Sequence, residues 1–309
     1  MSKKAVSRAQ ASIEASREAR DLYLRLLAMA LAGGLQDRVL TPVAPSGRKG
    51  RLFEPIRRLL ESRGLVVARS MSISEDTFAD SPPPRIPGAE TLIGPRGLDN
   101  IRGCVEQILE DDVPGDLIET GVWRGGAAAF MRAVLKAHDE TQRTVWAADS
   151  FRGLPTPGES GYEADVDEEF WAELDWLNVS LEDARRTFEK YGLLDEQVQF
   201  LVGWFAETLP NAPMEKLALI RLDGDMYGST MDALTALYPR LSSGGYVIVD
   251  DYWLPRCRAA VDDYRREHGV TDTIRRVDRA IAYWRRGSYV FALHMFELAS
   301  LDFASPCIV

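Results

Sequence analysis

The sequence predicts an α/β fold built on a mostly parallel, doubly wound β-sheet. From about residue 93 onward, short apolar runs rich in β-branched residues alternate with amphipathic stretches of helical periodicity. Apolar runs of this kind are typical of strands buried on both faces of a parallel sheet. Their alternation with helices indicates βαβ units. Five strands are predicted in the segments DLIETG, VWAADS, QVQFLVG, LALIRLDGD and GYVIVDDY.

Two further β segments, DTIRRVDRAIAYW and SYVFALHMF, follow the last helix. They are joined by too few residues for a helical crossover, so we expect them to form an antiparallel pair at one edge of the sheet. The complete sheet then has seven strands, mostly parallel, with one antiparallel edge strand.

The first 92 residues differ in character and predict an N-terminal helical arm with a lid segment, followed by the α/β domain over residues 93–309. Residues 6–34 predict a helix that ends at a glycine pair. The amphipathic stretch LFEPIRRLLESRG predicts a second helix, docked on the core. The Pro-rich segment SEDTFADSPPPRIPGAE is expected to be an exposed loop or lid, as is the acidic, solvated run from Glu159 to Glu169.

Composition restricts the possible functions. The chain has 309 residues, 46% apolar and 27% charged, as in ordinary globular proteins. A net charge of −10 without a basic stripe argues against nucleic acid as a partner. We expect a cytoplasmic protein without membrane contact, because no apolar segment is long enough to span a bilayer. The cysteines Cys104, Cys257 and Cys307 lack disulfide or zinc spacing and are expected to be reduced and buried.

Acidic residues follow two neighbouring predicted strands. Asp223 and Asp225 end one strand, and Asp250 and Asp251 end the next. Ligands of open α/β sheets bind outside the carboxyl ends of the strands, and clustered carboxylates suit Mg²⁺. The sequence therefore predicts a divalent-metal site, although Asp225 could instead cap the helix that follows it.

A glycine turn follows the first strand of the α/β domain. Glu119 ends that strand, Gly121 allows a tight turn, and Gly125 and Gly126 allow close approach to the helix start. Asp149 ends the second strand, where it could accept hydrogen bonds from ribose hydroxyls. The turn lacks the GxGxxG fingerprint, which favours S-adenosylmethionine over NAD, and a plain strand-to-helix turn is the alternative. Trp204 and Phe205, after the third strand, could face an adenine ring or belong to the core.

Several long motifs, in order, resemble those of the macrocin O-methyltransferase family. They are ETGVWRGG, ADSFRGLP, LVGWFAETLP, RLDGDMYGSTMDALTALYPRLSSGGYVIVDDY and CRAAVDDYRREHG. The similarity runs from about Ala89 to Arg286 and also takes in ARDLYLRLL. The family comprises S-adenosylmethionine- and Mg²⁺-dependent sugar O-methyltransferases of antibiotic biosynthesis. The resemblance therefore implies a Rossmann-like class I methyltransferase fold, a sugar or glycoside as the small-molecule substrate, and a homo-oligomer.

The resemblance also assigns roles to individual residues. It implies that Asp223, Asp250 and Asp251 bind the metal and that Asp223 is the general base, for which Asp225 is the second candidate. The residues expected to contact S-adenosylmethionine are Thr91, Glu119, Gly121, Arg124, Gly125, Gly126, Asp149, Ser150, Gly203, Trp204, Phe205 and Asp223. The chain departs from the family pattern at Gly228, where the family often has Glu, and at Glu90, in a segment where it often has His.

These residues predict an enzyme that methylates a sugar hydroxyl of a glycosylated natural product or a nucleotide-activated deoxysugar. Segments 36–92 and 152–178 are candidate lids, with Trp171 and Trp176 as groups that could stack on the acceptor. The alternatives are a catechol- or polyphenol-type metal-dependent O-methyltransferase, an NAD- or nucleotide-sugar-binding oxidoreductase, and a non-catalytic homologue that serves as a partner subunit.

Overall fold

The computed structural model describes residues 3–43, 47–79, 82–156, 161–166 and 175–287. The chain divides into two compact units, Met1–Leu98 and Asp99–Val309. No helix in these described ranges is long and apolar enough to cross a membrane.

The larger unit contains, over its described residues, a seven-stranded sheet with the order β5-β4-β3-β6-β7-β9-β8. Its strands are β3 (Asp116–Thr120), β4 (Val145–Asp149), β5 (Val198–Val202), β6 (Leu217–Leu222), β7 (Leu241–Val249), β8 (Arg275–Arg276) and β9 (Ala282–Arg285). Neighbours from β5 to β7 run parallel, and β9 runs antiparallel to both β7 and β8. The predicted seven-stranded, mostly parallel sheet is confirmed.

The antiparallel strand, β9, lies one position in from the edge, and β8 forms the edge itself. Both come from the segment that was expected to supply a single strand. The turn between them is stabilised by Asp278, whose carboxylate accepts hydrogen bonds from the N–H groups of Ala280 and Ile281, each at 2.8 Å. The segment SYVFALHMF, residues 288–296, lies outside the described residues.

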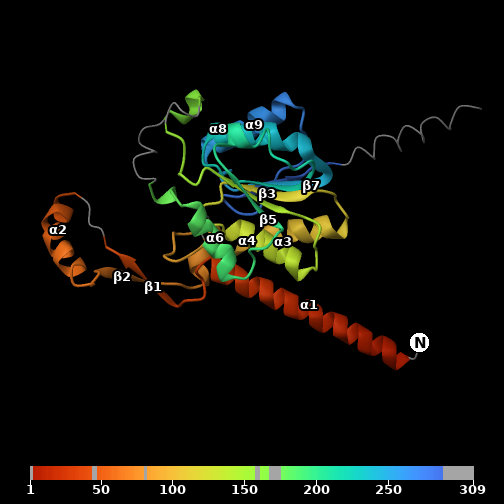
Figure 1. Ribbon diagram of the computed structural model, residues 1–309, viewed down its shortest axis with the longest axis horizontal. Coiled ribbons are helices and arrows are strands. Elements are labelled where there is room, and N and C mark those ends of the chain that lie inside the picture. Colours follow the sequence, from red (N-terminus) through yellow and green to blue (C-terminus); the bar gives the residue numbers. More distant parts are fainter. Residues whose placement is uncertain (1–2, 44–46, 80–81, 157–160, 167–174, 288–309) are drawn as a thin grey trace, which may run out of the picture. The chain divides into compact units, whose positions relative to one another are not determined.

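Helices cover both faces of this sheet, as the doubly wound pattern predicts. Figure 1 shows α8 and α9 over one face and α3, α4 and α6 over the other. The helix α3 (Pro95–Glu110) precedes β3. The elements between the strands are α4 (Gly126–Ala137), η2 (Glu163–Asp165), η3 (Asp175–Leu177), α6 (Leu181–Lys190), α7 (Phe205–Thr208), α8 (Tyr227–Leu237), η4 (Tyr238–Arg240) and α9 (Pro255–Glu267).

The central strand β6 is buried along its whole length. Its apolar residues pack with those of β7 and with α8 and α9 in one hydrophobic cluster that includes Ile220, Val247, Leu234 and Val261. Burial on both faces explains why this strand reads as a continuous apolar run. It also makes the one charged residue inside the run, Arg221, conspicuous.

The strand order reverses between β3 and β6. From β3 the chain moves outward to β4 and β5, and it then returns to β6 before moving outward to β7. Such a switch point opens a crevice outside the carboxyl ends of the two central strands, where open α/β sheets bind their ligands. Glu119 on β3 and Asp223 after β6 lie at these two strand ends.

The smaller unit contains the long helix α1 (Lys3–Leu31), the helix α2 (Gly47–Glu61), the short segment η1 (Glu75–Phe78) and the antiparallel strands β1 (Arg38–Pro42) and β2 (Ala68–Ser72). The first predicted helix is confirmed, and Gly33 follows it with φ +75°. The strands β1 and β2 were not predicted, because they pair across an insertion and lack an apolar alternation.

Two residues on the apolar face of α2, Ile56 and Leu59, are 54% and 53% exposed, and the docking of this helix on the core stays a prediction. The amphipathic pattern predicted the helix correctly but carried no information about its partner. The Pro-rich connector is not simply exposed, because Ile86 and Ala89 pack on Val39 of β1 in a small buried cluster.

Candidate active site

Three aspartates meet at the carboxyl ends of β6 and β7. Asp223 follows β6, and Asp250 and Asp251 follow β7. The backbone N–H of Asp250 donates to the carbonyl of Leu222 at 2.9 Å, which keeps the two strand ends level. One carboxylate oxygen of each aspartate lies within 4.8 Å of the other two. The structure thus brings together the three residues that were predicted to act together, and their role as metal ligands remains a prediction.

A buried arginine that was not predicted to belong to the site lies among these carboxylates. Arg221 is 1% exposed, and its guanidinium donates to Asp223 Oδ2 at 2.8 Å and to Asp250 Oδ1 at 2.7 Å. Its Nη1 also donates to Glu119, which lies opposite Arg221 in the register of β3 and β6. The sequence held a signal for it, since a charge two residues before Asp223 projects to the same side of the sheet.

The site contains more carboxyl groups than cationic groups. Burial raises the pKa of Glu119 to about 8, against the opposing effect of Arg221. Burial also raises the pKa of Asp225 to about 7 and that of Asp250 to about 7. The pKa of Asp251 is raised well above its usual range, by burial first and then by the neighbouring carboxylates. Such crowding of buried carboxylates favours the binding of a cation.

The glycine turn after β3 lies directly against the end of β6. Gly121 has φ +89°, and a Cβ atom at this position would lie only 1.5 Å from the backbone oxygen of Asp223. Any side chain here would therefore force the two strand ends apart. The close approach of the ends of β3 and β6 thus explains why position 121 requires glycine.

Asp149 fastens the turn after β3 to the turn after β4. Its Oδ2 accepts hydrogen bonds from the N–H groups of Val122 at 2.7 Å and Trp123 at 3.2 Å, and its Oδ1 accepts one from Phe151 at 2.7 Å. Trp123 and Phe151 both have positive φ, which this arrangement stabilises. The structure therefore gives Asp149 a role in shaping the turns, and contact with ribose remains a prediction.

The next three predicted cofactor residues lie at the start of α4. Gly125 has φ +86°, and a Cβ atom here would lie 3.1 Å from the backbone oxygen of Ala184 on α6. Gly126 is the first residue of α4 and is buried. The guanidinium of Arg124 lies 4.5 Å from the ring centre of Trp123. Gly125 therefore serves the packing of α4 on α6, in addition to any role toward a ligand.

Two predicted cofactor residues have hydroxyls that are engaged locally. Ser150 Oγ donates to the carbonyl of Gly153 at 2.7 Å and accepts from the N–H of Arg152 at 3.0 Å, so it stabilises the turn after β4. Thr91 belongs to the smaller unit, where it is buried and its Oγ1 accepts from the N–H of Ile93 at 3.3 Å. Contact of either residue with a cofactor remains a prediction.

The predicted adenine-facing residues follow β5. Gly203 has φ +141°, and a Cβ atom here would lie 2.7 Å from Thr208 Cγ2. Trp204 is half-buried and precedes α7. Phe205 packs against the main hydrophobic cluster, and its ring lies beside Gly224 at the end of β6. Phe205 is thus partly a core residue, which was the alternative that the sequence left open.

Asp225 does not cap the helix that follows it. The residue that precedes α8 is Met226, and the carboxylate at the helix start belongs to Asp165, which accepts hydrogen bonds from the N–H groups of Tyr227 and Gly228, each at 2.8 Å. Asp225 instead has φ +57° and donates its N–H to Asp251 Oδ2 at 3.1 Å. This contact joins Asp225 to the three-aspartate cluster.

The acidic run before α6 is not a solvated loop where the structure describes it. Asp165 is fully buried, and Tyr162 donates its hydroxyl to Asp232 Oδ1 on α8 at 3.0 Å. A Cβ atom at Gly228 would lie 2.6 Å from the ring of Tyr162 and 2.9 Å from Asp165 Oδ2. The packing of this segment on α8 therefore explains why Gly228 is not the Glu that is frequent in the family.

One of the two tryptophans predicted to stack on an acceptor can be placed. Trp176 is 38% exposed, and its ring lies edge-on to that of Trp123 with 6.2 Å between centroids. The Nε1 of Trp123 donates to the backbone oxygen of Trp176 at 3.3 Å. Trp171 lies outside the described residues. The aromatic pair adjoins the glycine turn after β3.

The residues present fit the two small molecules that the sequence predicts. Three convergent carboxylates are an all-oxygen donor set of the kind that Mg²⁺ prefers. Glu119 is 1% exposed, and its Oε2 is buried without a hydrogen-bond partner among the described residues. A hydrogen-bond donor on a cofactor in the glycine turn could satisfy this oxygen.

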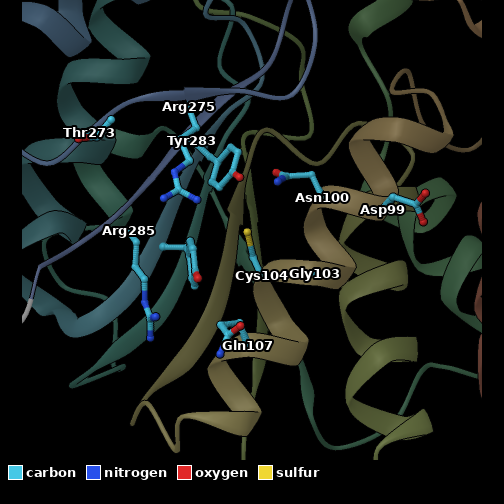
Figure 2. A pocket seen from close by; sticks show the side chains of 10 residues that line it. Asp99, Asn100, Gly103, Cys104, Gln107, Thr273, Arg275, Tyr283 and Arg285 are labelled. Carbon is cyan, nitrogen blue, oxygen red and sulfur yellow. The ribbon is translucent and has the colours of Figure 1, made fainter. Parts of the chain in front are cut away.

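A separate cavity of about 500 Å³ lies between α3 and the strands β7, β8 and β9 (Figure 2). It contains none of the predicted site residues. Cys104 lines it, and burial raises the pKa of this thiol to about 12, which makes it a poor nucleophile. Arg285, also in the lining, pairs with Asp111 at 2.5 Å. Cys104 and Cys257 are buried and free, as predicted, and Cys307 lies outside the described residues.

Comparison with known proteins identifies relatives of this chain. The family model described as macrocin-O-methyltransferase matches residues 22–286. The chain is 52% identical over 202 residues to the mycinamicin III 3''-O-methyltransferase of Micromonospora griseorubida, which covers 65% of this chain and 80% of that protein. It is 54% identical over 197 residues to a Streptomyces olivaceus 4'-O-methyltransferase of a dimethoxy-rhamnosyl-tetracenomycin, covering 64% and 76%.

A solved structure, that of the O-methyltransferase NovP, has the same fold. It superposes with a TM-score of 0.72 at 44% identity and covers 87% of this chain and all of that one. The predicted class I methyltransferase fold is therefore confirmed.

Proposed function

Since the chain belongs to the macrocin-O-methyltransferase family and is an O-methyltransferase, we propose that it transfers a methyl group from S-adenosylmethionine to a sugar hydroxyl of a glycosylated natural product, at a Mg²⁺ site. The names of its relatives, one of which specifies a rhamnosyl group, support the sugar acceptor. The observation that carries the metal-dependent part is the convergence of Asp223, Asp250 and Asp251 at the carboxyl ends of β6 and β7.

In this proposal the three aspartates hold Mg²⁺ through their carboxylate oxygens. When bound, Mg²⁺ would lower the pKa of a sugar hydroxyl and help to orient it. The cofactor would lie in the glycine turn beside the end of β6, and Glu119 would accept a hydrogen bond from it. The chain thereby supplies two adjacent sites, one for the methyl donor and one for the acceptor oxygen, and their proximity contributes to the rate.

A carboxylate at the end of β6 takes the acceptor proton. S-adenosylmethionine would supply the methyl group to the acceptor oxygen, and S-adenosylhomocysteine would be the leaving group. Asp223 is the first candidate for the base because it belongs to the cluster. Asp225 is the second, because it follows the same strand and its N–H donates to Asp251 of the cluster.

A mass-spectrometric screen tests this function. Purified protein and S-adenosylmethionine are incubated with glycosylated natural products, nucleotide deoxysugars and, for comparison, catechols, each with Mg²⁺ or with EDTA. We expect a gain of one methyl group on a glycoside or nucleotide sugar that EDTA abolishes and added Mg²⁺ restores. Methylation that persists in EDTA would contradict the metal site, and methylation of catechols alone would contradict the sugar acceptor.

We further propose that the chain forms a homo-oligomer through α1. Leu22 and Leu26 are 69% and 56% exposed and, four residues apart, lie on one face of this helix. Light scattering after size-exclusion chromatography should give a mass of at least twice 34.5 kDa, reduced in the double variant L22E/L26E. A monomeric mass for the unaltered chain would contradict this proposal.

A further inference from the structure

Arg221 contacts carboxylates from both parts of the proposed site, Glu119 on the cofactor side and Asp223 and Asp250 on the metal side. It lies on β6 two residues before Asp223, opposite Glu119 on β3, and its guanidinium reaches Asp250 at the end of β7. A guanidinium is a rigid, planar fork whose N–H groups point in fixed directions. Three carboxylates from three neighbouring strands are therefore oriented by one side chain.

The exposures of these side chains show which way each faces. The Arg221 side chain is 1% exposed, whereas those of Asp223 and Asp250 are 27% and 14% exposed. The Arg221 guanidinium thus lies on the inner side of the carboxylates of Asp223 and Asp250, and these two carboxylates lie between the guanidinium and the solvent. With one oxygen of each aspartate on the guanidinium, the second oxygen of each remains for a ligand arriving from outside.

We propose that Arg221 is a positioning residue, which fixes the carboxylates of Asp223 and Asp250 in the orientation that the divalent cation requires. This inference rests on the proposed function. It assigns Arg221 no contact with the metal, the cofactor or the substrate. It predicts that the arginine stays in place when the metal binds and that loss of its fork weakens metal binding.

Simple electrostatics predicts the opposite sign, which makes the inference testable. A buried positive charge beside a cation site repels the incoming cation. If charge alone mattered, removal of the arginine would tighten metal binding. If the guanidinium only occupied the place of the metal, it would leave the carboxylates when the metal binds. If orientation matters more, replacement of the fork should weaken binding about 10- to 100-fold, as the loss of groups that orient metal ligands usually does.

The main experiment compares Arg221→Lys with Arg132→Lys. Both arginines are buried and paired with carboxylates, but Arg132 pairs with Asp195, away from the strand-end site. Lysine keeps the charge and loses the fork in each case. Mn²⁺ serves as the probe, and its Kd is measured by electron paramagnetic resonance in the presence of S-adenosylhomocysteine, with thermal unfolding recorded for every protein.

We expect the Mn²⁺ Kd to rise at least tenfold in R221K and to stay within about twofold of the unaltered protein in R132K, even where both melt at similarly lowered temperatures. An unchanged or lower Kd in R221K would overturn the inference. A Kd that rises equally in both variants would also overturn it, because the effect would then be one of general stability.

A second measurement uses the unaltered protein and does not depend on how a variant folds. In protein labelled with ¹⁵N-arginine, the guanidinium signals of Arg221 should remain slow to exchange when diamagnetic Mg²⁺ is added. In a separate sample, Mn²⁺ should broaden the Arg221 signals through its proximity, while those of Arg132 stay sharp. Rapid exchange of the Arg221 protons after Mg²⁺ addition would show that the side chain has left the carboxylates and would overturn the inference.

The two proposals fail in different ways. If the unaltered protein binds no Mn²⁺, the metal site of the proposed function is wrong, and the role of Arg221 falls with it. If the unaltered protein binds Mn²⁺ and R221K binds it equally well, the metal site stands and only the positioning role is wrong.

Discussion

The two buried arginines of the α/β unit meet their carboxylates in different ways. Arg132 on α4 makes a bidentate pair with one aspartate, Asp195, with Nε to Oδ1 at 2.9 Å and Nη2 to Oδ2 at 2.7 Å. Arg221 is shared among three carboxylates on three strands. Arg132 thus has one carboxylate partner for its single positive charge, whereas Arg221 has three.

The pKa shifts follow this difference. Arg132 lowers the pKa of Asp195, the usual result of a matched pair. Around Arg221, burial outweighs the arginine and raises the pKa of Asp250 to about 7 and that of Glu119 to about 8. A balanced pair stabilises the fold, whereas a group of carboxylates held in excess of their counter-charge is typical of sites that bind a further cation.

The largest expected effect comes from removal of one carboxylate from the group around Arg221. Asp250→Asn keeps the size of the side chain and removes a proposed metal ligand, so we expect methyl transfer to fall at least about a hundredfold with the fold intact. Turnover with Mg²⁺ and circular dichroism measure the two effects. The matched control is Asp262→Asn on α9, whose side chain is 51% exposed. Normal turnover of D250N in Mg²⁺ would contradict the metal assignment.

The close approach of β3 and β6 can be broken separately from the charges. Gly121→Ala would place a Cβ atom 1.5 Å from the backbone oxygen of Asp223, so the strand ends must separate. We expect a loss of about 3 kcal/mol in the free energy of unfolding, since overpacking adds to the cost of a left-handed residue.

The control for this variant is Gly192→Ala. Gly192 also has a positive φ, +64°, but a Cβ atom there meets no atom within 4 Å. Only the backbone cost of roughly 1–2 kcal/mol should therefore appear in urea unfolding of G192A. Equal losses in the two variants would show that the proximity of the strand ends is not what requires glycine at position 121.

The sequence predicted the part of the site that depends on strand ends, and it missed the part that depends on register. Asp223 and Asp250 could be placed together because the carboxyl ends of parallel strands share one edge of the sheet. The pairing of Arg221 with Glu119 depends on the alignment of β3 with β6, which two separate apolar runs do not specify. Asp165 was missed for a similar reason, because its partner, the start of α8, is 62 residues away from it.

The fold shows the same division between local and long-range information. The five parallel strands were predictable from their apolar runs, and the hairpin of β8 and β9 was missed because one short segment makes both strands through a turn at Asp278. In the smaller unit, α2 was predictable from its periodicity, but the exposure of Ile56 was not.

In the matched pair of Arg132 and Asp195, the change Asp195→Asn should lower the stability of the fold and leave methyl transfer intact. Asp195 precedes β5 and so lies at the amino end of that strand, opposite the proposed site. Breaking a fully buried ion pair costs about 3–5 kcal/mol; because the Asp195 side chain is 25% exposed, we expect a loss of about 2 kcal/mol. Urea unfolding and turnover per folded molecule measure both. Loss of turnover without loss of stability would contradict this assignment.

The smallest expected effect is the change with pH in the difference in unfolding free energy between the unaltered protein and D195N. Because Arg132 lowers the pKa of Asp195 in the folded protein, the pair stabilises the fold fully above the unfolded pKa of about 3.9. Its contribution is lost as the pH falls through the lowered folded value. The gap in unfolding free energy between the unaltered protein and D195N should therefore be constant from about pH 7 to 5 and narrow below about pH 4. Urea midpoints across this range measure it. A gap that stays constant down to the lowest pH at which the protein folds would mean that the asparagine acts through packing, and that the ionised carboxylate is not what balances Arg132.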